Sequence, residues 1–413
     1  MPVKRSGFVA DDYNLTMKRC SRCLLPETHE TISFDSRGIC SVCQNREYRD
    51  ESIDWGLRRS KLDKLLSNIR DLADYDCIVP FSGGKDSTFT LLFAVRELQL
   101  KPLVVSFDHG FYRPNMLANR NRVVENLGVD LLTFKPNWLL VRKLMLQSLL
   151  EKGDFCWHCH TGIFSYPMWV SIEKKIPLVL WGEPSSEYAS YYSYEDDEKV
   201  DENRFNQIVN LGITSLDMKM RMGQGFNQRD FKPYTYPPRK LLQESKIVSI
   251  PLGSYIPWNP QAQSSLISAE LGWKGDEVEG VPPEFNYEKI ECYMQGVRDY
   301  IKYRKRGYSR VSHLMALELR KGAIDKDRAK EMISLFEGKR PASLDIFLEM
   351  LGISEDEFED IIKKHRVDPW DDKILVEIGK RPHDYDSWQT KPPLSSQESK
   401  LIVQNFRNGS FDS

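Results

Sequence analysis

VPFSGGKDS, at residues 79–87, decides the fold class of this chain of 413 residues. An apolar run at 76–81 leads into it and predicts a strand, and the segment at 87–98 that follows has the apolar spacing of a helix. Gly83 and Gly84 allow the backbone to turn tightly between the two elements. The turn therefore directs backbone N–H groups and the positive end of a helix at one point, an arrangement that binds phosphate.

The polar side chains of this loop indicate a phosphate site with a metal ion. The hydroxyl groups of Ser82 and Ser87 can donate to phosphate oxygens, and the ammonium group of Lys85 can neutralise them. The carboxylate of Asp86 would repel a phosphate, whereas it suits Mg²⁺ as a ligand. The loop lacks the G-x-x-x-x-G-K-[ST] spacing of Walker loops, which argues against phosphoryl transfer. The alternative is a glycine turn that only joins a strand to a helix, but such a turn does not need Lys, Asp and Ser together.

Strands and helices alternate through this half of the chain. Apolar runs predict strands at 76–81, 103–107, 130–134 and 177–181, and helical spacing falls at 87–98, 115–127, 138–151 and 162–174. This alternation predicts an α/β fold with a doubly wound parallel sheet, which binds ligands at the carboxyl ends of its strands. Asp108 ends the second predicted strand, and Gly182 and Glu183 end a later one. These three residues are therefore candidates for the site, although both carboxylates can equally cap the next segment.

Three regions are expected along the chain. They are a cysteine module at 17–50, the α/β domain at 51–290 with an insertion around 190–238, and a helical C-terminal region at 291–413. A polar helical stretch at 52–72 joins the first two. Within the insertion, the acidic part is expected to be solvated, and the part rich in Gly, Pro and Gln is a candidate lid. In the C-terminal region, short helices are expected at 325–336 and 343–351.

Four of the eight cysteines form two C-x-x-C pairs near the N-terminus. Cys20 and Cys23 are separated from Cys40 and Cys43 by sixteen residues, which is the spacing of a zinc ribbon with four thiolate ligands. The intervening segment is expected to form a small β-hairpin. Four thiolates leave no open coordination position, so the predicted role of the zinc is structural.

Another C-x-x-C pair, Cys156 and Cys159, lies in the segment FCWHCH. It can be half of a metal or iron–sulfur site, a redox pair, or two buried thiols beside the site. Only Cys77 and Cys292 remain elsewhere. Cys77 lies inside the first predicted strand, where a core thiol is expected.

Composition limits the class of protein. The chain is 40% hydrophobic and 29% charged and has no run of eighteen apolar residues, so no membrane span is expected. The N-terminus has no apolar core of a secretory signal, and the C-x-x-C pairs favour a reducing compartment, so the predicted location is cytoplasmic. A net charge of −2 lowers the expectation of nucleic-acid binding.

The loop SGGKDS resembles the S-G-G-x-D-S motif of the PP-loop ATP pyrophosphatases. This resemblance implies that residues 82–87 bind the pyrophosphate of ATP and that the reaction passes through an adenylated intermediate. It also implies adenosine contacts at the end of the second strand, near Asp108.

Four segments together resemble a narrower family. They are KRCSRC at 18–23, PFSGGKDST at 80–88, FCWHCHTGIF at 155–164 and YSRVSH at 308–313. They are similar to the N-acetyl sugar amidotransferases of bacterial surface-polysaccharide and nonulosonic-acid biosynthesis, and the resemblance covers roughly residues 17 to 370.

This family resemblance implies an amidotransferase reaction that uses ATP and Mg²⁺. The acetamido oxygen of a nucleotide-activated or free N-acetyl sugar attacks ATP, and ammonia then displaces AMP to give an acetamidino group. The products belong to lipopolysaccharide O-antigen or nonulosonic-acid pathways. Arg310 and Glu183 are candidates for binding substrate or Mg²⁺. Because residue 2 is proline and no G-x-C-x-G turn occurs, the ammonia is expected from a separate glutaminase subunit, with a cyclase-like subunit as a further partner.

Two other functions remain open from the sequence. A PP-loop enzyme that thiolates tRNA also combines a ribbon with SGGKDS, and the basic string at 302–306 favours it slightly, although that string can also be a solvated helix face. A zinc-dependent scaffold with a vestigial nucleotide site is the non-enzymatic alternative. The intact polar residues of the loop argue against it.

Overall fold

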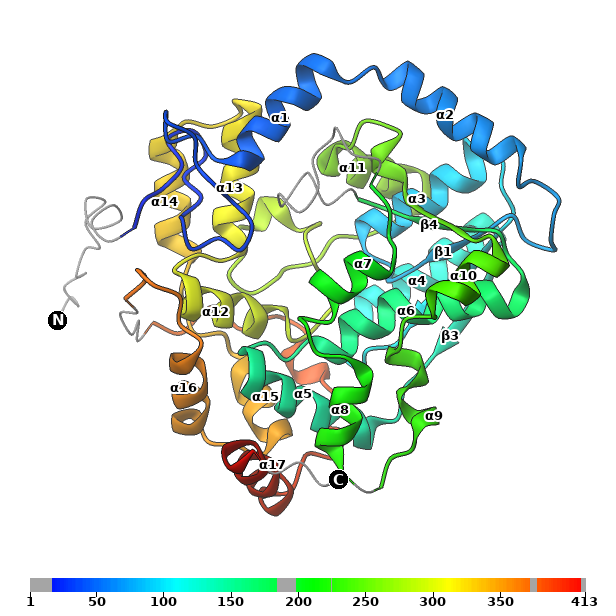
Figure 1. Ribbon diagram of the computed structural model, residues 1–413. Coiled ribbons are helices and arrows are strands. Elements are labelled where there is room, and N and C mark those ends of the chain that lie inside the picture. The colour runs from blue at the N-terminus through cyan, green and yellow to red at the C-terminus, as the bar shows by residue number, and fades with distance from the viewer. Residues whose placement is uncertain (1–16, 184–197, 224, 372–376, 410–413) are drawn as a thin grey trace.

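The computed structural model describes residues 17–183, 198–223, 225–371 and 377–409 (Figure 1). At its centre lies one parallel sheet of five strands in the order β3-β2-β1-β4-β5. The strands are β1 (Cys77–Pro80), β2 (Pro102–Phe107), β3 (Asp130–Phe134), β4 (Leu178–Trp181) and β5 (Val248–Pro251). The order reverses between β1 and β4, and the loop 81–84 follows β1 at this reversal. A switch in strand order is where a doubly wound sheet opens a crevice for ligands.

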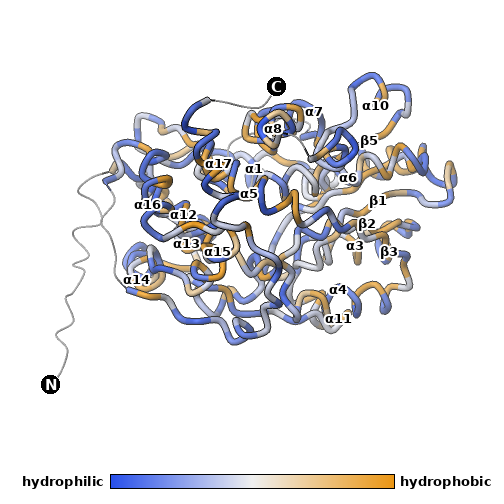
Figure 2. The backbone as a smooth tube through the Cα atoms, turned by 90° about the horizontal axis from the view of Figure 1, so that it is seen from below, coloured by the Kyte–Doolittle hydropathy of each residue, from blue (hydrophilic) through white to orange (hydrophobic). Residues whose placement is uncertain are grey.

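Helices cover both faces of this sheet. Figure 2 shows α3, α4 and α11 on one side of the strands and α6 and α10 on the other. These helices are α3 (Lys85–Arg96), α4 (Pro114–Leu127), α6 (Trp157–Lys174), α10 (Arg239–Ser245) and α11 (Pro260–Leu271). Every residue of β2 and β4 is buried, as expected for strands covered twice. The predicted fold class, an α/β fold with a doubly wound parallel sheet, is confirmed.

The predicted elements occur with small shifts of their ends. The helix expected at 162–174 begins earlier, at Trp157, because the carboxylate of Asp154 accepts from the N–H of Cys156 at 2.7 Å and organises the start of the helix. The stretch expected at 52–72 forms one helix, α2 (Trp55–Ser67), and a further helix that was not expected, α1 (Ser41–Ser52), precedes it within the predicted cysteine module. They separate at Asp54, whose side chain caps α2 by accepting from the N–H of Leu57.

A helical region follows the sheet, in agreement with the prediction. Its helices are α12 (Gln295–Arg306), α13 (Arg310–Lys321), α14 (Lys326–Phe336), α15 (Ser343–Leu351), α16 (Glu355–Lys364) and α17 (Ser396–Asn408). Helix α5 (Trp138–Lys152) joins this region to the sheet, since it contacts α15 and α17 as well as α6. Four apolar residues of α5 are fully buried: Leu144, Met145, Leu146 and Leu149. They point in different directions around the helix, as expected for a helix that is covered on all sides.

The insertion around 190–238 is described in part: the acidic stretch expected to be solvated begins outside the described residues, and the stretch predicted as a candidate lid is folded. Residues 184–197 and 224 lie outside the described residues. The remainder forms α7 (Glu202–Arg204), the π-helix η3 (Phe205–Val209), α8 (Ser215–Met222), α9 (Gln228–Phe231) and the 3₁₀ turn η4 (Lys232–Tyr234). Phe205, Met218 and Phe231 are buried in cores that include α6. Burial of these aromatic and methionine side chains stabilises this segment as a fixed part of the domain.

The segment between the two N-terminal cysteine pairs also differs from its prediction. Instead of a β-hairpin it forms isolated bridges, Arg19 with Pro26 and Phe34 with Cys40. Regular strand pairing cannot extend here because Cys40 passes directly into helix α1.

None of the helices in the described part of the chain is long and apolar enough to cross a membrane.

Buried histidines predict loss of stability in mild acid. Burial lowers the pKa of His109 to about 4, against an ordinary value of 6.5. Between these two pH values the unfolded chain binds a proton that the folded chain does not, so stability falls as the pH falls. One such histidine contributes up to about 1.4 kcal/mol per pH unit.

The variant His109→Asn isolates this contribution. The asparagine amide oxygen can still accept from the N–H of Phe111, which lies 3.2 Å from Nδ1 of His109. Urea unfolding at several pH values between 6.5 and 4 should give a shallower dependence of stability on pH for the variant than for the wild type. Equal slopes would show that His109 does not titrate in this way.

Candidate functional site

A cleft of roughly 900 Å³, partly open to solvent, lies at the carboxyl ends of β1, β2 and β4. One part of its wall is apolar, formed by Phe107, Ile163, Phe164, Trp181 and Val200. The rings of Phe164 and Trp181 stack with their centroids 4.8 Å apart. The other part is polar and charged, formed by Ser82, Asp86, Ser87, Glu183, Lys289 and Glu291. The cleft can therefore hold a molecule with a flat apolar end and a charged end.

The predicted phosphate loop forms the polar end of the cleft. Gly83 has φ +87°, and a Cβ on it would lie 2.9 Å from the sulfur of Met116. A Cβ on Gly84 would lie 1.9 Å from the carboxylate of Glu291. Gly83 is thus required by its backbone conformation, whereas at Gly84 a side chain would have to displace the carboxylate of Glu291 from the loop. Gly84 is the N-cap of α3, so the start of that helix faces the loop.

The two serines of the loop lie side by side. Their hydroxyl oxygens are 3.2 Å apart, and the hydroxyl of Ser82 donates to Glu291 over 3.4 Å. The N–H of Gly84 donates to Ser82 over 3.2 Å. The loop thus gathers hydroxyl and N–H donors around one acidic side chain, and these donors are the groups that a phosphate would use.

Lys85 does not point into the cleft, contrary to the expectation from the sequence. Only 2% of the residue is exposed, and its ammonium group lies 2.8 Å from Glu288 and 2.9 Å from Asp86. Burial alone would lower the pKa of Lys85, but these carboxylates outweigh it and hold the pKa well above its ordinary value. Glu288 is itself 1% exposed, so the two residues form a buried ion pair below the loop.

Asp86 and Glu183 lie at the cleft with one carboxylate oxygen each that has no partner among the described residues. These atoms are Oδ1 of Asp86 and Oε2 of Glu183, and both are buried. Burial, followed by the charge of Glu183, raises the pKa of Asp86. Lys289 lies 3.3 Å from the other oxygen of Glu183. Two carboxylates, each with a buried oxygen that has no partner among the described residues, fit Mg²⁺, which uses one or two carboxylates together with phosphate oxygens and water.

The other predicted residues of the α/β domain lie in different environments. Gly182 lines the cleft, and a Cβ on it would lie 3.0 Å from the hydroxyl of Thr90. The carboxylate of Asp108 accepts from the N–H of Gly110 at 2.9 Å, as a cap does, and Asp108 is not among the cleft residues. Its predicted contact with adenosine stays a prediction.

Arg310 also lies apart from the cleft. Its guanidinium group is 3.7 Å from Asp299 in helix α12, and Arg310 is not among the cleft residues. The structure therefore does not bring Arg310 together with the loop and Glu183, as was expected for a ligand of substrate or Mg²⁺ at that site.

Sequence reasoning missed the segment at 288–291. Glu288, Lys289 and Glu291 reach the loop from a stretch about two hundred residues later in the chain. They follow the 3₁₀ turn η6 (Pro283–Phe285) and belong to no strand or long helix, so no periodic pattern marks them.

The loop is surrounded by an excess of two negative charges. Two ammonium groups, those of Lys85 and Lys289, face four carboxylates, those of Asp86, Glu183, Glu288 and Glu291. A polyanion can bind there only together with a cation.

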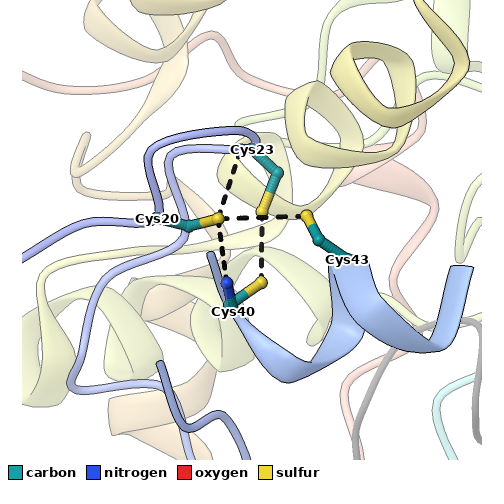
Figure 3. A group of neighbouring side chains, drawn as sticks. All are labelled: Cys20, Cys23, Cys40 and Cys43. Carbon is teal, nitrogen blue, oxygen red and sulfur yellow. Dashed lines mark hydrogen bonds between the residues drawn. The ribbon is translucent and has the colours of Figure 1, made fainter. Parts of the chain in front are cut away.

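The four N-terminal cysteines converge as predicted. Cys20, Cys23, Cys40 and Cys43 are buried, and their sulfur atoms all lie within 4.8 Å of one another (Figure 3). The sulfur atoms of Cys20 and Cys43 are 3.9 Å apart, and those of Cys23 and Cys40 are 3.6 Å apart. Tetrahedral zinc with Zn–S bonds of about 2.3 Å places its ligands roughly 3.8 Å apart. The cluster therefore fits zinc as a structural ion.

The remaining C-x-x-C pair lies at the start of α6. Cys156 is the N-cap and Cys159 lies in the first turn, and both are half-buried. Cys77 is buried in β1, in agreement with a core thiol.

Magnesium dependence tests the role of Asp86. Asp86→Asn keeps the shape of the side chain but removes its charge, so we expect the affinity for Mg²⁺ to fall by on the order of tenfold to a hundredfold. Part of the lost activity should return as Mg²⁺ is raised. Asp76→Asn, at the other end of β1, is the matched control and should leave the Mg²⁺ titration unchanged. Equal titrations for the Asp86 variant and the wild type would exclude Asp86 as a ligand.

Comparisons with known proteins match parts of the chain. Residues 284–399 match the model of the C-terminal domain of WbpG-like LPS biosynthesis proteins. An uncharacterized protein of Methanocaldococcus jannaschii, MJ1599, is 27% identical over 122 residues, which are 29% of this chain and 43% of that protein. The chain thus spans less than half the length of this relative.

Among solved structures, the U34-tRNA thiolase NcsA from Methanococcus maripaludis with its [4Fe-4S] cluster aligns at a TM-score of 0.26. The alignment covers 88% of this chain and 99% of that chain at 12% identity. The match over residues 284–399 agrees with the resemblance to enzymes of bacterial surface-polysaccharide biosynthesis that the sequence indicates, since this C-terminal part of the chain is similar to the C-terminal domain of WbpG-like LPS biosynthesis proteins.

Proposed function

We propose that this protein is a PP-loop enzyme that cleaves ATP to AMP and pyrophosphate in order to amidate an N-acetyl sugar for a bacterial surface glycan. One observation carries the proposal. The SGGKDS loop lies between β1 and α3 at the switch in strand order, next to the carboxylates of Asp86 and Glu183, each of which has a buried free oxygen that suits Mg²⁺.

The shape and polarity of the cleft support ATP as the ligand. Its apolar wall, with the stacked rings of Phe164 and Trp181, is suited to a purine, and the loop at the other end is suited to phosphates. Glu291 occupies the mouth of the loop, where its carboxylate accepts from Ser82. A bound pyrophosphate would take over these donors and displace that carboxylate.

The residues at the loop have distinct roles in this proposal. The hydroxyl and N–H donors hold the departing pyrophosphate, and the pair of Asp86 and Glu183 holds Mg²⁺, which neutralises the phosphates. Lys289, at the rim, is the ammonium group placed to contact the nucleotide directly. Lys85 acts from below, by fixing Asp86 and by adding positive charge under the loop.

In the proposed sugar reaction, the cleavage of ATP activates the acetamido oxygen of the sugar. The acetamido oxygen bonds to the α-phosphorus and pyrophosphate leaves. Ammonia then adds to the imidate carbon, and AMP leaves with that oxygen, which gives the acetamidino group. The WbpG-like domain at 284–399 supports a glycan as the substrate, and a separate glutaminase subunit as the source of ammonia belongs to the same proposal.

The basic string at 302–306, which favoured the alternative of a tRNA-thiolating enzyme, does not support it in the folded chain. This string lies in α12 and contacts groups of the same chain. Arg304 pairs with Glu359, while Lys302 and Arg306 lie 3.5 Å and 3.3 Å from Glu30. The ammonium group of Lys305 donates to the carbonyl of Lys152. These side chains are therefore engaged in packing the ribbon and the helices, which makes them poor candidates for a surface that binds RNA.

A direct assay tests the sugar reaction. The protein is incubated with ATP, Mg²⁺, ¹⁵N-ammonium and nucleotide-activated N-acetyl sugars, and the sugars are analysed by mass spectrometry. The expected product has one oxygen replaced by a ¹⁵N-labelled imino group, formed together with AMP. If AMP is released only when tRNA is added and no sugar acquires the label, the sugar assignment is wrong.

A further inference from the structure

Arg120, on helix α4, lies beside the SGGKDS loop. Its Cβ is 3.3 Å from the point that a Cβ on Gly83 would occupy. Helix α4 begins at Pro114, shortly after the carboxyl end of β2, and long side chains on a helix point back towards its N-terminus. The side chain of Arg120 therefore runs towards the edge of the sheet where the cleft opens.

The guanidinium group of Arg120 ends next to a residue of the cleft. Its Cζ lies over the ring of Tyr112, 5.5 Å from the ring centroid. Tyr112 lines the cleft together with Ser82 and Ser87 of the loop, whereas Arg120 is not among the lining residues. The side chain of Arg120 thus spans from the loop to the wall of the cleft and places its charge at the side of both.

This guanidinium group has no hydrogen-bond or ion-pair partner among the described residues, and its Nε and Nη1 atoms are buried. A buried donor without a partner is destabilising, and contact with one aromatic ring compensates for it only weakly. Arg122, on the same helix, differs: it donates to the side chain of Asn119 over 2.9 Å and to the carbonyl of Gly272 over 3.0 Å. A cost to stability such as that of Arg120 is typical of residues that serve function.

The charges around the loop give this cation a use. The ammonium groups of Lys85 and Lys289 are both paired with carboxylates, and the loop is surrounded by an excess of negative charge. Arg120 adds a cation beside the loop whose donors are not taken by another residue in the part of the chain that the structure describes. A guanidinium group presents its N–H donors in a planar fork that matches two oxygens of a phosphate.

We propose that Arg120 binds the two terminal phosphates of the nucleotide from the α4 side of the loop. This inference rests on the proposed function, since it assigns a further residue to the same site. The hydroxyl groups of Ser82 and Ser87 and the N–H groups of the loop hold the phosphates from one side, and the guanidinium group of Arg120 neutralises them from the side of Gly83. Because Arg120 lies by the loop and not by Phe164 and the rest of the apolar wall, it acts on the pyrophosphate part of ATP.

Binding of pyrophosphate tests the proposal without turnover. The affinities of the full chain for pyrophosphate and for AMP, each with Mg²⁺, are measured by calorimetry, and stability is measured by urea unfolding without ligand. Arg120→Met keeps the aliphatic stem beside Gly83 and removes the donors. Its Kd for pyrophosphate should rise on the order of tenfold to a hundredfold, as expected for the loss of a charged hydrogen-bonding group, while its Kd for AMP stays close to that of the wild type.

The stability of Arg120→Met should be equal to or higher than that of the wild type, because the change removes buried donors that have no partner. Arg120→Lys keeps the charge without the fork, so its affinity for pyrophosphate should lie between those of Arg120→Met and the wild type. Arg122→Met is the matched control. It should lower stability, through loss of the bonds to Asn119 and Gly272, and keep the wild-type affinity for pyrophosphate.

A purely structural role predicts for Arg120→Met the pattern of this control, lower stability with unchanged affinity for pyrophosphate, and that result would overturn the proposal. An equal loss of affinity for AMP and for pyrophosphate would overturn it as well, since Arg120 would then act on another part of the nucleotide. Wild-type protein that binds neither ATP nor pyrophosphate would contradict the proposed function itself, and this inference with it.

Discussion

Lys85→Ala is expected to lower kcat by on the order of a hundredfold or more, as comparable losses of one electrostatic stabiliser do. The same change should destabilise the fold by about 3–5 kcal/mol, because it leaves the carboxylate of Glu288 buried without its partner. The sequence alone predicts only the first effect, since it places Lys85 in the cleft. Steady-state rates at saturating ATP, together with urea unfolding, measure both.

A double variant separates catalysis from stability. Lys85→Met with Glu288→Leu removes both buried charges, and replacement of a buried ion pair by apolar side chains is often neutral for stability. We expect most of the stability to return while kcat stays low. A double variant with wild-type kcat would show that Lys85 serves only to hold the fold.

Loss of zinc is expected to have the second large effect. Structural zinc contributes about 10–16 kcal/mol to the folding of isolated zinc modules. In this chain the ribbon also anchors α12 and α13, since Thr28 exchanges hydrogen bonds with Arg306 and Ala316 packs against the cysteines. Cys43→Ala or a chelator should therefore lower the melting temperature and expose residues 17–50 to proteolysis.

Nucleotide affinity should change much less than stability in this variant, because no ribbon residue lines the cleft. Cys77→Ala is the control for loss of a thiol outside the ribbon and should retain its zinc. Freshly purified protein without zinc, or a Cys43→Ala variant as stable as the wild type, would contradict the structural role of the ion.

The sequence predicts the part of the site that is local in the chain. The strand, the glycine turn and the helix start around SGGKDS are adjacent residues whose geometry follows from their own properties, and Cys20 to Cys43 carry a fixed spacing. Strand β5 is missed because its four residues, VSIP, are only half apolar and too short to show a period.

The environment of Lys85 is missed for a different reason. Its partner, Glu288, comes from a segment without periodic structure, and no local pattern reports which carboxylate will be buried beside it. The position of Arg310 is likewise set by a distant residue, since its guanidinium group lies 3.7 Å from Asp299 of α12, away from the loop. Long-range contacts of this kind depend on how the helical region docks, and that docking is visible only in the folded chain.

The products of ATP cleavage test the central claim most directly. The protein is given ATP labelled at the α-phosphate, with Mg²⁺, ammonium and an N-acetyl sugar nucleotide, and the nucleotides are separated and counted. A PP-loop mechanism predicts labelled AMP and an equal amount of pyrophosphate. Labelled ADP with inorganic phosphate would contradict it.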